Sequence, residues 1–468
     1  MSAEPRKDRP FCPASPRAIL LTGGVIVAAV LAAYYNSFAT PFVFDDGPAI
    51  RDNLSLRHLW PIADVLRPLT GLTVEGRPVI NLTLALNYAA GGTNVWGYHA
   101  VNLGIHLLAS LTLFGLVRRT LQQPGPGRLA AAPAVPVAGA AALLWALHPL
   151  QTEAVTYVVQ RAESLMALFY LLTLYCFVRS TASPARGRWQ LAAAAACLLG
   201  MACKEVMVSA PLIVLLYDRT FVSGTFRQAW RQHARLHLGL AATWILLGVL
   251  VADMGGQRGG TAGFGLGVSA WAYALTQCRA IVHYLQLSLW PHPLVFDYGT
   301  AVTQDAAQVV PQALLLAALV LGTAYALWRR PVPGFLGAWF FAILAPTSSL
   351  VPVATQTVAE HRMYLPLAAL AALAAAGAHR FAGPRGLAAC LALALGLGAL
   401  TAQRNRDYRS ALHLWADTVA KMPDSPRAHY NLGVELGKSA QPQQEIAEYR
   451  EALRLKPDYA EAYYNLAN

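Results

Sequence analysis

The sequence predicts an all-helical membrane domain with many spans, followed by a short segment of helical repeats. Of its 468 residues, 56% are hydrophobic and 13% are charged, whereas a soluble globular protein carries roughly 25% charged residues. The hydrophobic residues are also grouped in blocks that can cross a bilayer, which takes about 20 residues per helix. After about residue 404 the composition becomes charged and amphipathic, which marks a second, water-exposed part.

The net charge of +12 does not indicate nucleic-acid binding. The arginines lie mostly in short loops between apolar blocks, where the positive-inside rule places them, and no soluble basic face is left to bind a nucleic acid. The six cysteines show no CxxC spacing, so we expect packing residues and not a disulfide framework. They are Cys12, Cys176, Cys197, Cys203, Cys278 and Cys390.

Charge and polarity along the apolar blocks predict the topology. The blocks lie at about 18–35, 99–117, 129–147, 163–178, 190–203, 205–217, 237–253, 271–290, 312–328, 334–345, 363–379 and 386–402. Block 271–290 contains Arg279, His283 and two glutamines, which are unfavourable in hydrocarbon unless they line a cavity. If it is re-entrant or interfacial, about 11 spans remain and most loop Lys and Arg residues fall on one side. That side is then cytoplasmic, together with the tail 1–17.

The first long loop, 36–98, and the C-terminal segment are accordingly predicted on the outer side. The membrane domain covers 18–403, and the segment 404–468 repeats with a period of 34 residues: Trp415 precedes Tyr449 by this distance. This period is the signature of the tetratricopeptide repeat (TPR). A repeat unit buries its apolar face only by stacking on a neighbour, so we expect it to lean on the membrane domain or on a second chain. Its concave face would bind protein; a purely structural cap is the alternative.

Two adjacent carboxylates, Asp45 and Asp46, stand in the first outer loop directly after an apolar run. Near the end of a membrane helix they must be solvated, hydrogen-bonded or metal-bound. An ordinary turn explains them equally well, because Asp favours turns and Gly47 and Pro48 follow.

More ionisable side chains fall on the same predicted face. Each alone is explained as a helix-end anchor, but ionisable groups that gather within a membrane tend to mark sites and to pair with one another. Sugar transfer from a lipid phosphate needs a carboxylate as base and cations or a metal at the departing phosphate. The candidates for donor phosphate or substrate binding are Arg77, His99, His148, Glu153, Arg161, Lys204, Glu205, His361 and Arg362.

An ordered set of motifs resembles the transmembrane-and-tetratricopeptide-repeat O-mannosyltransferases. Any one of these strings is a weak signal, but together they follow the order of that family over the whole membrane domain, and the repeats come in the expected place. The strings lie at 44–53, 77–78, 86–88, 98–106, 148–155, 161–163, 204–205, 217–218, 290–298 and 359–366. The chain departs from the family in its short repeat segment, which puts the presentation of an acceptor in doubt.

The resemblance implies a fold of the GT-C glycosyltransferase type with its active site in the first outer loop. It implies a polyprenyl-phosphate-linked sugar, with mannose as the expected sugar, as donor and Ser or Thr hydroxyls of a protein as acceptor. A cell-surface glycan is the alternative acceptor. In related folds the first acid of such a pair acts as base or binds a metal, so Asp45 is the expected base with Asp46 as its partner. The cofactor expectation is none, or a divalent Mg or Mn held by this pair.

Their positive charge and their place on the predicted outer face favour Arg77, Arg161 and Arg362 for the lipid phosphate, with His361 beside them. The Ala-, Gly-, Leu- and Arg-rich composition indicates a bacterial inner membrane, or the endoplasmic reticulum if the source is eukaryotic. Two rival functions remain open at this point. One is a non-catalytic membrane scaffold that binds a partner through its repeats, and the other is a lipid or solute transporter.

Overall fold

The computed structural model describes residues 15–125, 133–255, 261–265 and 267–467. Within these ranges the chain is helical, and a single isolated β-bridge joins Ala262 to Val353. Most of the tail 1–17, with Cys12, lies outside the described residues, as do Arg128 and Arg258.

The α-helices are α1 (Pro16–Tyr34), α2 (Ile62–Leu66), α3 (Pro78–Gly91), α4 (Val95–Leu121), α5 (Ala134–Ala146), α6 (Thr152–Thr156), α7 (Arg161–Ala182), α8 (Arg186–Met201), α9 (Ala210–Tyr217), α10 (Phe226–Asp253), α11 (Ala270–Leu289), α12 (Val310–Arg329), α13 (Pro331–Leu344), α14 (Leu367–Asn405), α15 (Ala411–Lys421), α16 (Pro426–Lys438), α17 (Pro442–Leu455) and α18 (Ala460–Ala467). Shorter helical turns are η1 (Gly47–Arg51), η2 (Leu54–Leu56), η3 (Pro149–Gln151), η4 (Val158–Gln160), η5 (Glu205–Ser209), η6 (Asp218–Ser223), η7 (Ala306–Val309), η8 (Glu360–Met363) and η9 (Arg406–Arg409).

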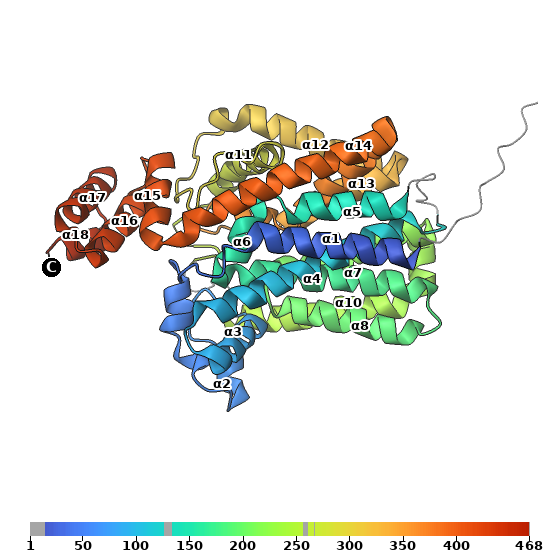
Figure 1. Cartoon of the computed structure of the whole chain (residues 1–468), viewed down its shortest axis with the longest axis horizontal. Helices are drawn as coiled ribbons and strands as arrows, with labels where there is room; N and C mark the ends of the chain where they lie inside the picture. Colours follow the sequence, from blue (N-terminus) through green and yellow to red (C-terminus); the bar gives the residue numbers. More distant parts are fainter. Residues whose placement is uncertain (1–14, 126–132, 256–260, 266, 468) are drawn as a thin grey trace, which may run out of the picture.

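Long apolar helices run side by side and form the membrane domain (Figure 1). Seven helical segments of the described chain are long and apolar enough to cross a bilayer, and α5 with its bent continuation through α6 adds an eighth. A helix suits lipid because its backbone groups pair within the segment. The chain is therefore a multi-pass membrane protein, and the predicted all-helical fold is confirmed.

The seven or eight segments are fewer than the about 11 spans predicted from apolar blocks of about 20 residues, for two reasons. Helices α8 and α13 stand where predicted but have 16 and 14 residues, which is short for a span on its own. In addition, the blocks 363–379 and 386–402 both lie in α14, which counts as one segment.

Element α14 is a helical hairpin. Its backbone leaves the helical region at Gly383, where φ is 57° and ψ is −135°. Both ends lie against α6: Asn405 accepts a hydrogen bond from Thr156 at 2.7 Å, and the turn just before α14 pairs with Glu153. The chain therefore crosses the bundle twice here, as the two predicted blocks require.

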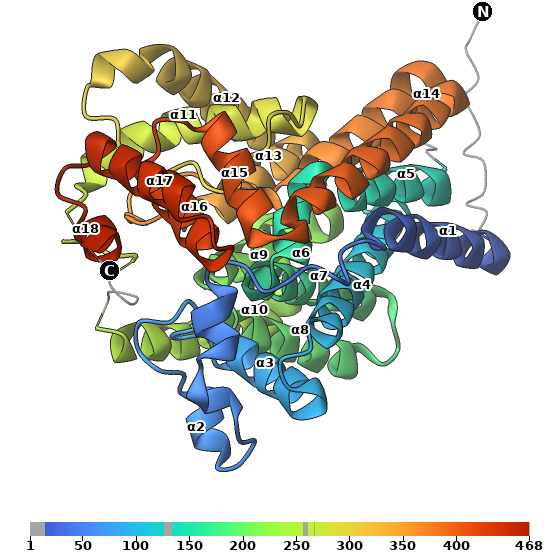
Figure 2. The same cartoon turned by 60° about the vertical axis from the view of Figure 1, so that its left-hand side comes forward.

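Helix α11 contains the polar block 271–290, and it lies across the long helices (Figures 1 and 2). Its side chains contact the 345–359 loop along most of its length. The Tyr273 hydroxyl donates to a backbone carbonyl of this loop at 2.7 Å, Gln277 does the same at 2.9 Å, and the Tyr284 hydroxyl accepts a backbone N–H at 2.9 Å. Since one loop at one end of the bundle contacts α11 from Tyr273 to Tyr284, the geometry favours the interfacial interpretation of this block.

Helices α15 to α18 form the repeat segment at the same end of the bundle (Figure 2). Helices α16 and α17 pack closely because Gly433 has no side chain: a Cβ there would lie 2.6 Å from the Tyr449 ring. Asn465 of α18 donates to the hydroxyls of Tyr430 and Tyr449 at 3.3 Å. The aromatic and Asn positions of the 34-residue period therefore form the contacts between successive helices.

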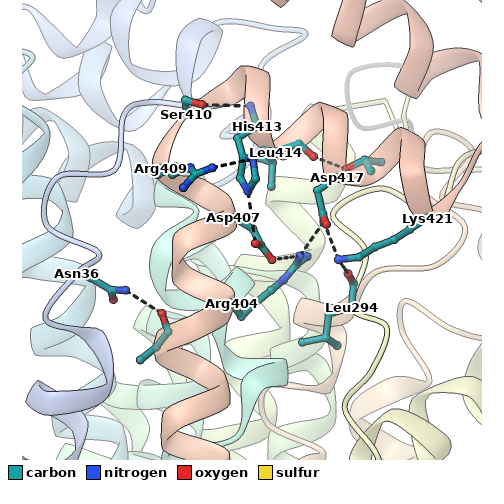
Figure 3. A network of polar contacts seen from close by, with 12 residues as sticks. Asn36, Leu294, Arg404, Asp407, Arg409, Ser410, His413, Leu414, Asp417 and Lys421 are labelled. Carbon is teal, nitrogen blue, oxygen red and sulfur yellow. Dashed lines mark hydrogen bonds and ion pairs between the residues drawn. The ribbon is translucent and has the colours of Figure 1, made fainter.

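An ion-pair network fastens the repeat segment to the end of α14 (Figure 3). Arg404 donates to Asp407 at 2.8 Å and to Asp417 at 3.3 Å. Lys421 donates to Asp417 at 2.7 Å and to the backbone carbonyl of Leu294 at 2.9 Å. The Arg404 side chain is buried, and a buried cation needs such partners. The repeat segment thus leans on the membrane domain, which is one of the two predicted arrangements.

The turn at Gly383 gives a test of the hairpin. Gly383→Ala should lower the melting temperature of the detergent-solubilised protein, because an L-residue in this backbone region costs about 1–3 kcal/mol. The control is Gly377→Ala in the same helix, where a Cβ also meets open space but φ is ordinary; it should be neutral or stabilising by up to about 1 kcal/mol. Equal melting temperatures for the two variants would contradict the hairpin geometry.

Candidate active site

A cavity of about 580 Å³ opens at the end of the bundle that the first loop and the repeat segment share. Segments from the whole length of the chain meet around it. They are the first loop, α6, η4, the start of η5, the end of α10, the loops after α11 and α13, and α16. Its polar lining includes Asp45, Arg77, Glu153, Tyr157, Gln160, Lys204, Glu205, Asp297, Gln356, His361, Arg362 and Arg427.

The two adjacent aspartates have different surroundings. Asp45 lines the cavity, and its backbone N–H donates to the Tyr157 hydroxyl at 3.0 Å. Asp46 is fully buried: its Oδ2 accepts the Val43 N–H at 3.1 Å and its Oδ1 accepts the Val159 N–H at 2.7 Å. Asp46 therefore ties the first loop to the start of the α7 region, while Asp45 is presented to the cavity.

The backbone of Phe44 produces this division. Its φ is 46°, in the left-handed region that a bulky residue rarely adopts. Such strain persists only where the surroundings determine the conformation, and it is concentrated at functional sites. The ring of Phe44 packs edge-on against Phe296 and against Trp415 of α15, with centroids 6.1 and 5.4 Å apart. The repeat segment thus helps to hold the residue that precedes Asp45.

Burial raises the pKa of Asp46 to about 8, although the Val43 and Val159 N–H groups favour the ionised form. The desolvation of a buried carboxylate opposes its charge more strongly than two hydrogen bonds support it. Asp46 is accordingly suited to holding the loop in place.

Four cations among the described residues line the cavity, and the three from the membrane domain differ in their partners. Arg77 pairs with Glu205 at 3.4 Å, and Lys204 pairs closely with Glu163. Arg362 instead donates to neutral oxygens, among them the backbone carbonyl of residue 357 at 3.0 Å. Its other described acceptors are the Tyr273 hydroxyl and the carbonyl of residue 356. Within the described part of the chain, Arg362 is thus the cavity cation whose hydrogen bonds all go to neutral groups.

His361 and Glu153 form a buried pair beside these cations. The His361 Nδ1 lies 2.7 Å from the Glu153 carboxylate, which also accepts the His361 backbone N–H at 2.9 Å. Burial and then the neighbouring Lys204 hold the pKa of His361 well below its usual range. A neutral His361 donates its Nδ1–H to Glu153, and its Nε2 can accept a hydrogen bond from a sugar hydroxyl, but it adds no positive charge for a phosphate.

Besides Asp46, three of the predicted site residues do not line this cavity. Arg161 is fully buried and donates to Asn102 at 2.6 Å and to the Tyr98 carbonyl at 3.2 Å, so it joins α7 to α4. His99 contacts the carbonyl of residue 40 at 2.8 Å. His148 accepts the N–H of residue 150 and contacts the carbonyl of residue 288, each at 3.2 Å. These side chains position helices and loops around the cavity.

The structure also brings in residues that the sequence did not single out as candidates. Tyr157 accepts the Asp45 N–H, and Asp297 pairs with Arg427 from the repeat segment. Asp297 lies in one of the strings of the resemblance, so a signal for it existed. Arg427 had none, because nothing in a repeat pattern predicts which of its side chains reaches the membrane domain.

The cavity also has an apolar side. It is formed by the end of α10, the first residues after Lys204 and the 345–359 loop. The apolar lining residues there are Val208, Leu247, Val251, Met254, Val351 and Val353. Cations next to an apolar wall suit an amphipathic ligand with an anionic head and a hydrocarbon chain.

The geometry shows whether Asp45 and Asp46 could bind a divalent metal together. Both oxygens of Asp46 are engaged by backbone N–H groups away from the cavity, so Asp45 would bind a metal there without its neighbour. Within the described ranges, the grouping of three close metal-ligating side chains is Asp218, His233 and His237. It lies beyond the far end of α9, where both histidines hydrogen-bond the Asp218 carboxylate at 2.7 and 2.9 Å.

Comparisons with known proteins agree with the motifs. Residues 446–468 match the model of the TPR repeat. Protein O-mannosyl-transferase Tmtc3 of Drosophila melanogaster is 28% identical over 98% of this chain and 58% of its own length. Protein O-mannosyl-transferase F38B6.6 of Caenorhabditis elegans is 22% identical over 93% of this chain and 63% of its own length. Over nearly its whole length, the chain is therefore similar to O-mannosyl-transferases of this type, while it spans about three fifths of these two relatives.

Solved structures were matched as well. The crystal structure of ArnT from Cupriavidus metallidurans bound to undecaprenyl phosphate has a TM-score of 0.43 at 16% identity and covers 97% of this chain and 77% of its own. The Archaeoglobus fulgidus oligosaccharyltransferase tethered with an acceptor peptide has a TM-score of 0.43 at 15% identity, with 88% of this chain and 59% of its own covered.

The burial of Asp46 predicts a pH effect on stability. Its pKa in the folded protein, about 8, lies above its ordinary value of 3.8, so the folded chain keeps a proton that the unfolded chain loses. The stability from this group is complete below the ordinary pKa and declines as the pH rises through the folded value. Asp46→Asn removes the titration, so the difference in melting temperature between wild type and variant should shrink as the pH rises towards 8. A difference that stays constant with pH would contradict this role.

Proposed function

We propose that this chain is a membrane glycosyltransferase of the GT-C type. It transfers a sugar, for which mannose is our first candidate, from a polyprenyl-phosphate-linked donor to Ser or Thr hydroxyls of a protein. One observation carries the proposal. A single cavity holds an accessible carboxylate, a set of cations and an apolar wall, in a chain that is similar over 98% of its length to a protein O-mannosyl-transferase.

The donor would lie with its phosphate at the cations and its hydrocarbon chain along the apolar wall. Arg362 suits the phosphate best, because its positive charge meets only neutral acceptors among the described residues. Arg77 and Lys204 add positive charge that Glu205 and Glu163 partly neutralise. The His361–Glu153 pair would hydrogen-bond hydroxyls of the sugar.

Asp45 would act as general base on the acceptor. In the transfer step the hydroxyl oxygen bonds to the anomeric carbon, the bond from that carbon to the phosphate oxygen breaks, and the hydroxyl proton passes to the Asp45 carboxylate. The lipid phosphate leaves with the bonding electron pair and gains negative charge, which Arg362 and its neighbours stabilise. The sugar passes through a cationic, oxocarbenium-like state, as in glycoside hydrolysis.

The sidedness follows from the distribution of loop charges. We place the N-terminus in the cytoplasm and the cavity on the outer side, which is the periplasm if the membrane is a bacterial inner membrane. The acceptor protein would then arrive from the side on which the repeat segment lies.

Asp45→Asn tests the base directly. It keeps the shape of the side chain but removes the base, so transfer from a polyprenyl-phosphate sugar to a Thr peptide should fall about 10²–10⁴-fold. Detergent-solubilised variant and wild type should melt alike, because the carboxylate lines a cavity. Asp46→Asn is the matched neighbour, and it should change stability more than the chemical step. Full activity of Asp45→Asn would refute the base assignment.

The rival functions give different results with the same variants. A non-catalytic scaffold would lose its function on deletion of the repeat segment after residue 404, and Asp45→Asn would leave it intact. A transporter would move a labelled lipid or solute across sealed vesicles without forming a covalent product. A product that carries the sugar on a Thr hydroxyl excludes both rivals.

Removal of divalent metal tests whether Asp45 works alone. We expect transfer to continue in excess chelator, because Arg362, Arg77 and Lys204 already supply positive charge at the cavity. Loss of transfer that Mg or Mn restores would instead assign Asp45 to a metal ion. Monitoring melting temperature in parallel separates such a loss from unfolding.

A further inference from the structure

The part of the cavity lining that Arg427 of the repeat segment forms with Asp297 differs in chemistry from the part that holds Arg77, Lys204 and Arg362. Arg427, at the start of α16, binds Asp297 with two N–H groups, one to each carboxylate oxygen, and donates a third to the backbone carbonyl of residue 355. Both side chains line the cavity. A paired guanidinium and carboxylate present hydrogen-bond donors and acceptors with little net charge.

Because Arg427 has a carboxylate partner and Arg362 has none among its described hydrogen-bond acceptors, the two arginines suit different ligands. A phosphate is best stabilised by a cation that no carboxylate has neutralised, which describes Arg362. Arg427 is neutralised by Asp297, so it is suited to a neutral, polar ligand. A guanidinium has five N–H donors, and the described residues occupy three of them here. The rest can bind peptide carbonyls.

Asp45 lies close to this part of the cavity lining. Burial lowers the pKa of the Arg427 guanidinium, but the negative charge of Asp297 outweighs this effect and raises the pKa. Asp45 adds a smaller contribution in the same direction. The residue before Asp45, Phe44, packs on Trp415 of the same repeat segment. A hydroxyl held at Arg427 would therefore reach the side of the cavity where Asp45 is presented.

We infer that the pocket wall formed by Arg427 and Asp297 is the acceptor subsite, where an extended Ser- or Thr-containing polypeptide binds between the repeat segment and the first loop. The inference rests on the proposed function, and it assigns the repeat segment a direct place in the active site. The donor occupies the neighbouring part of the cavity, at Arg362, which binds the carbonyls of residues 356 and 357 next to the residue 355 carbonyl that Arg427 binds. Helices α15 and α16 lie over this end of the bundle (Figure 2), and in the proposed topology a protein acceptor reaches the cavity from this side.

The test compares Arg427→Ala with wild type, using the full chain in detergent. Transfer to a fluorescent peptide of alternating Thr and Ala is measured beside donor hydrolysis by water. Arg427→Ala should raise the KM for the peptide about tenfold, the effect of losing roughly 1.4 kcal/mol of binding. The KM for the donor and the hydrolysis rate should stay unchanged, and Arg427→Lys should restore the peptide KM in part.

Arg454→Ala is the matched control. Arg454 lies on α17, is largely exposed and pairs with Glu451, so its loss removes the same charge from the repeat segment away from the cavity. It should leave both KM values unchanged. An unchanged peptide KM in Arg427→Ala, a raised donor KM, or an equal fall in hydrolysis and transfer would each overturn the inference.

Direct binding separates this inference from the proposed function. Fluorescence anisotropy of the same peptide, measured without donor, should show weaker binding to Arg427→Ala than to wild type. If wild type binds the peptide through Arg427 but turns over no polyprenyl-phosphate sugar, the glycosyltransferase proposal fails and the peptide subsite stands. If wild type turns over donor but Arg427→Ala binds peptide normally, the subsite fails alone.

Discussion

The paired hydrogen bonds of Asp46 are the interaction on which the arrangement of the cavity depends. One carboxylate oxygen accepts the Val43 N–H and the other accepts the Val159 N–H, so a loop and a distant helix start are held at one point. A buried polar group is costly unless it is fully paired, and here the pairing itself fixes the loop. With Asp46 turned inward, the strained backbone at Phe44 leaves Asp45 on the cavity side.

The same rule explains the other polar residues at this end of the bundle. Arg161 joins α7 to α4 through Asn102 and the Tyr98 carbonyl, and Arg404 joins α14 to the repeat segment through two aspartates. These two cations hold neighbouring helices together through hydrogen bonds and ion pairs. Arg362 differs from Arg404 because neutral groups hold it in place, and it differs from Arg161 because it lines the cavity and keeps its positive charge there.

Much of the fold could be read from the sequence, because its signals are local. The apolar blocks predict the membrane helices, and the polar side chains of block 271–290 distinguish it from the spans. The 34-residue period predicts the helix pairs of the repeat segment. The clustering of charges also predicted that Arg77, Lys204 and Arg362 would meet. The roles within the cluster needed the structure. Nothing local distinguishes Asp45 from Asp46, or Arg161 from Arg362, because the difference lies in hydrogen bonds between segments far apart in the chain.

The stacking of Phe44 on Trp415 joins the first outer loop to a helix that follows the last membrane crossing. During synthesis the loop is made well before its partner in α15, since a chain emerges from the ribosome N-terminus first. The loop that carries Asp45 therefore lacks one of its supports until α15 has been translated. The order of biosynthesis thus sets when the cavity becomes complete, and a chain interrupted after its last span would carry the membrane domain without the wall that Arg427 and Trp415 provide.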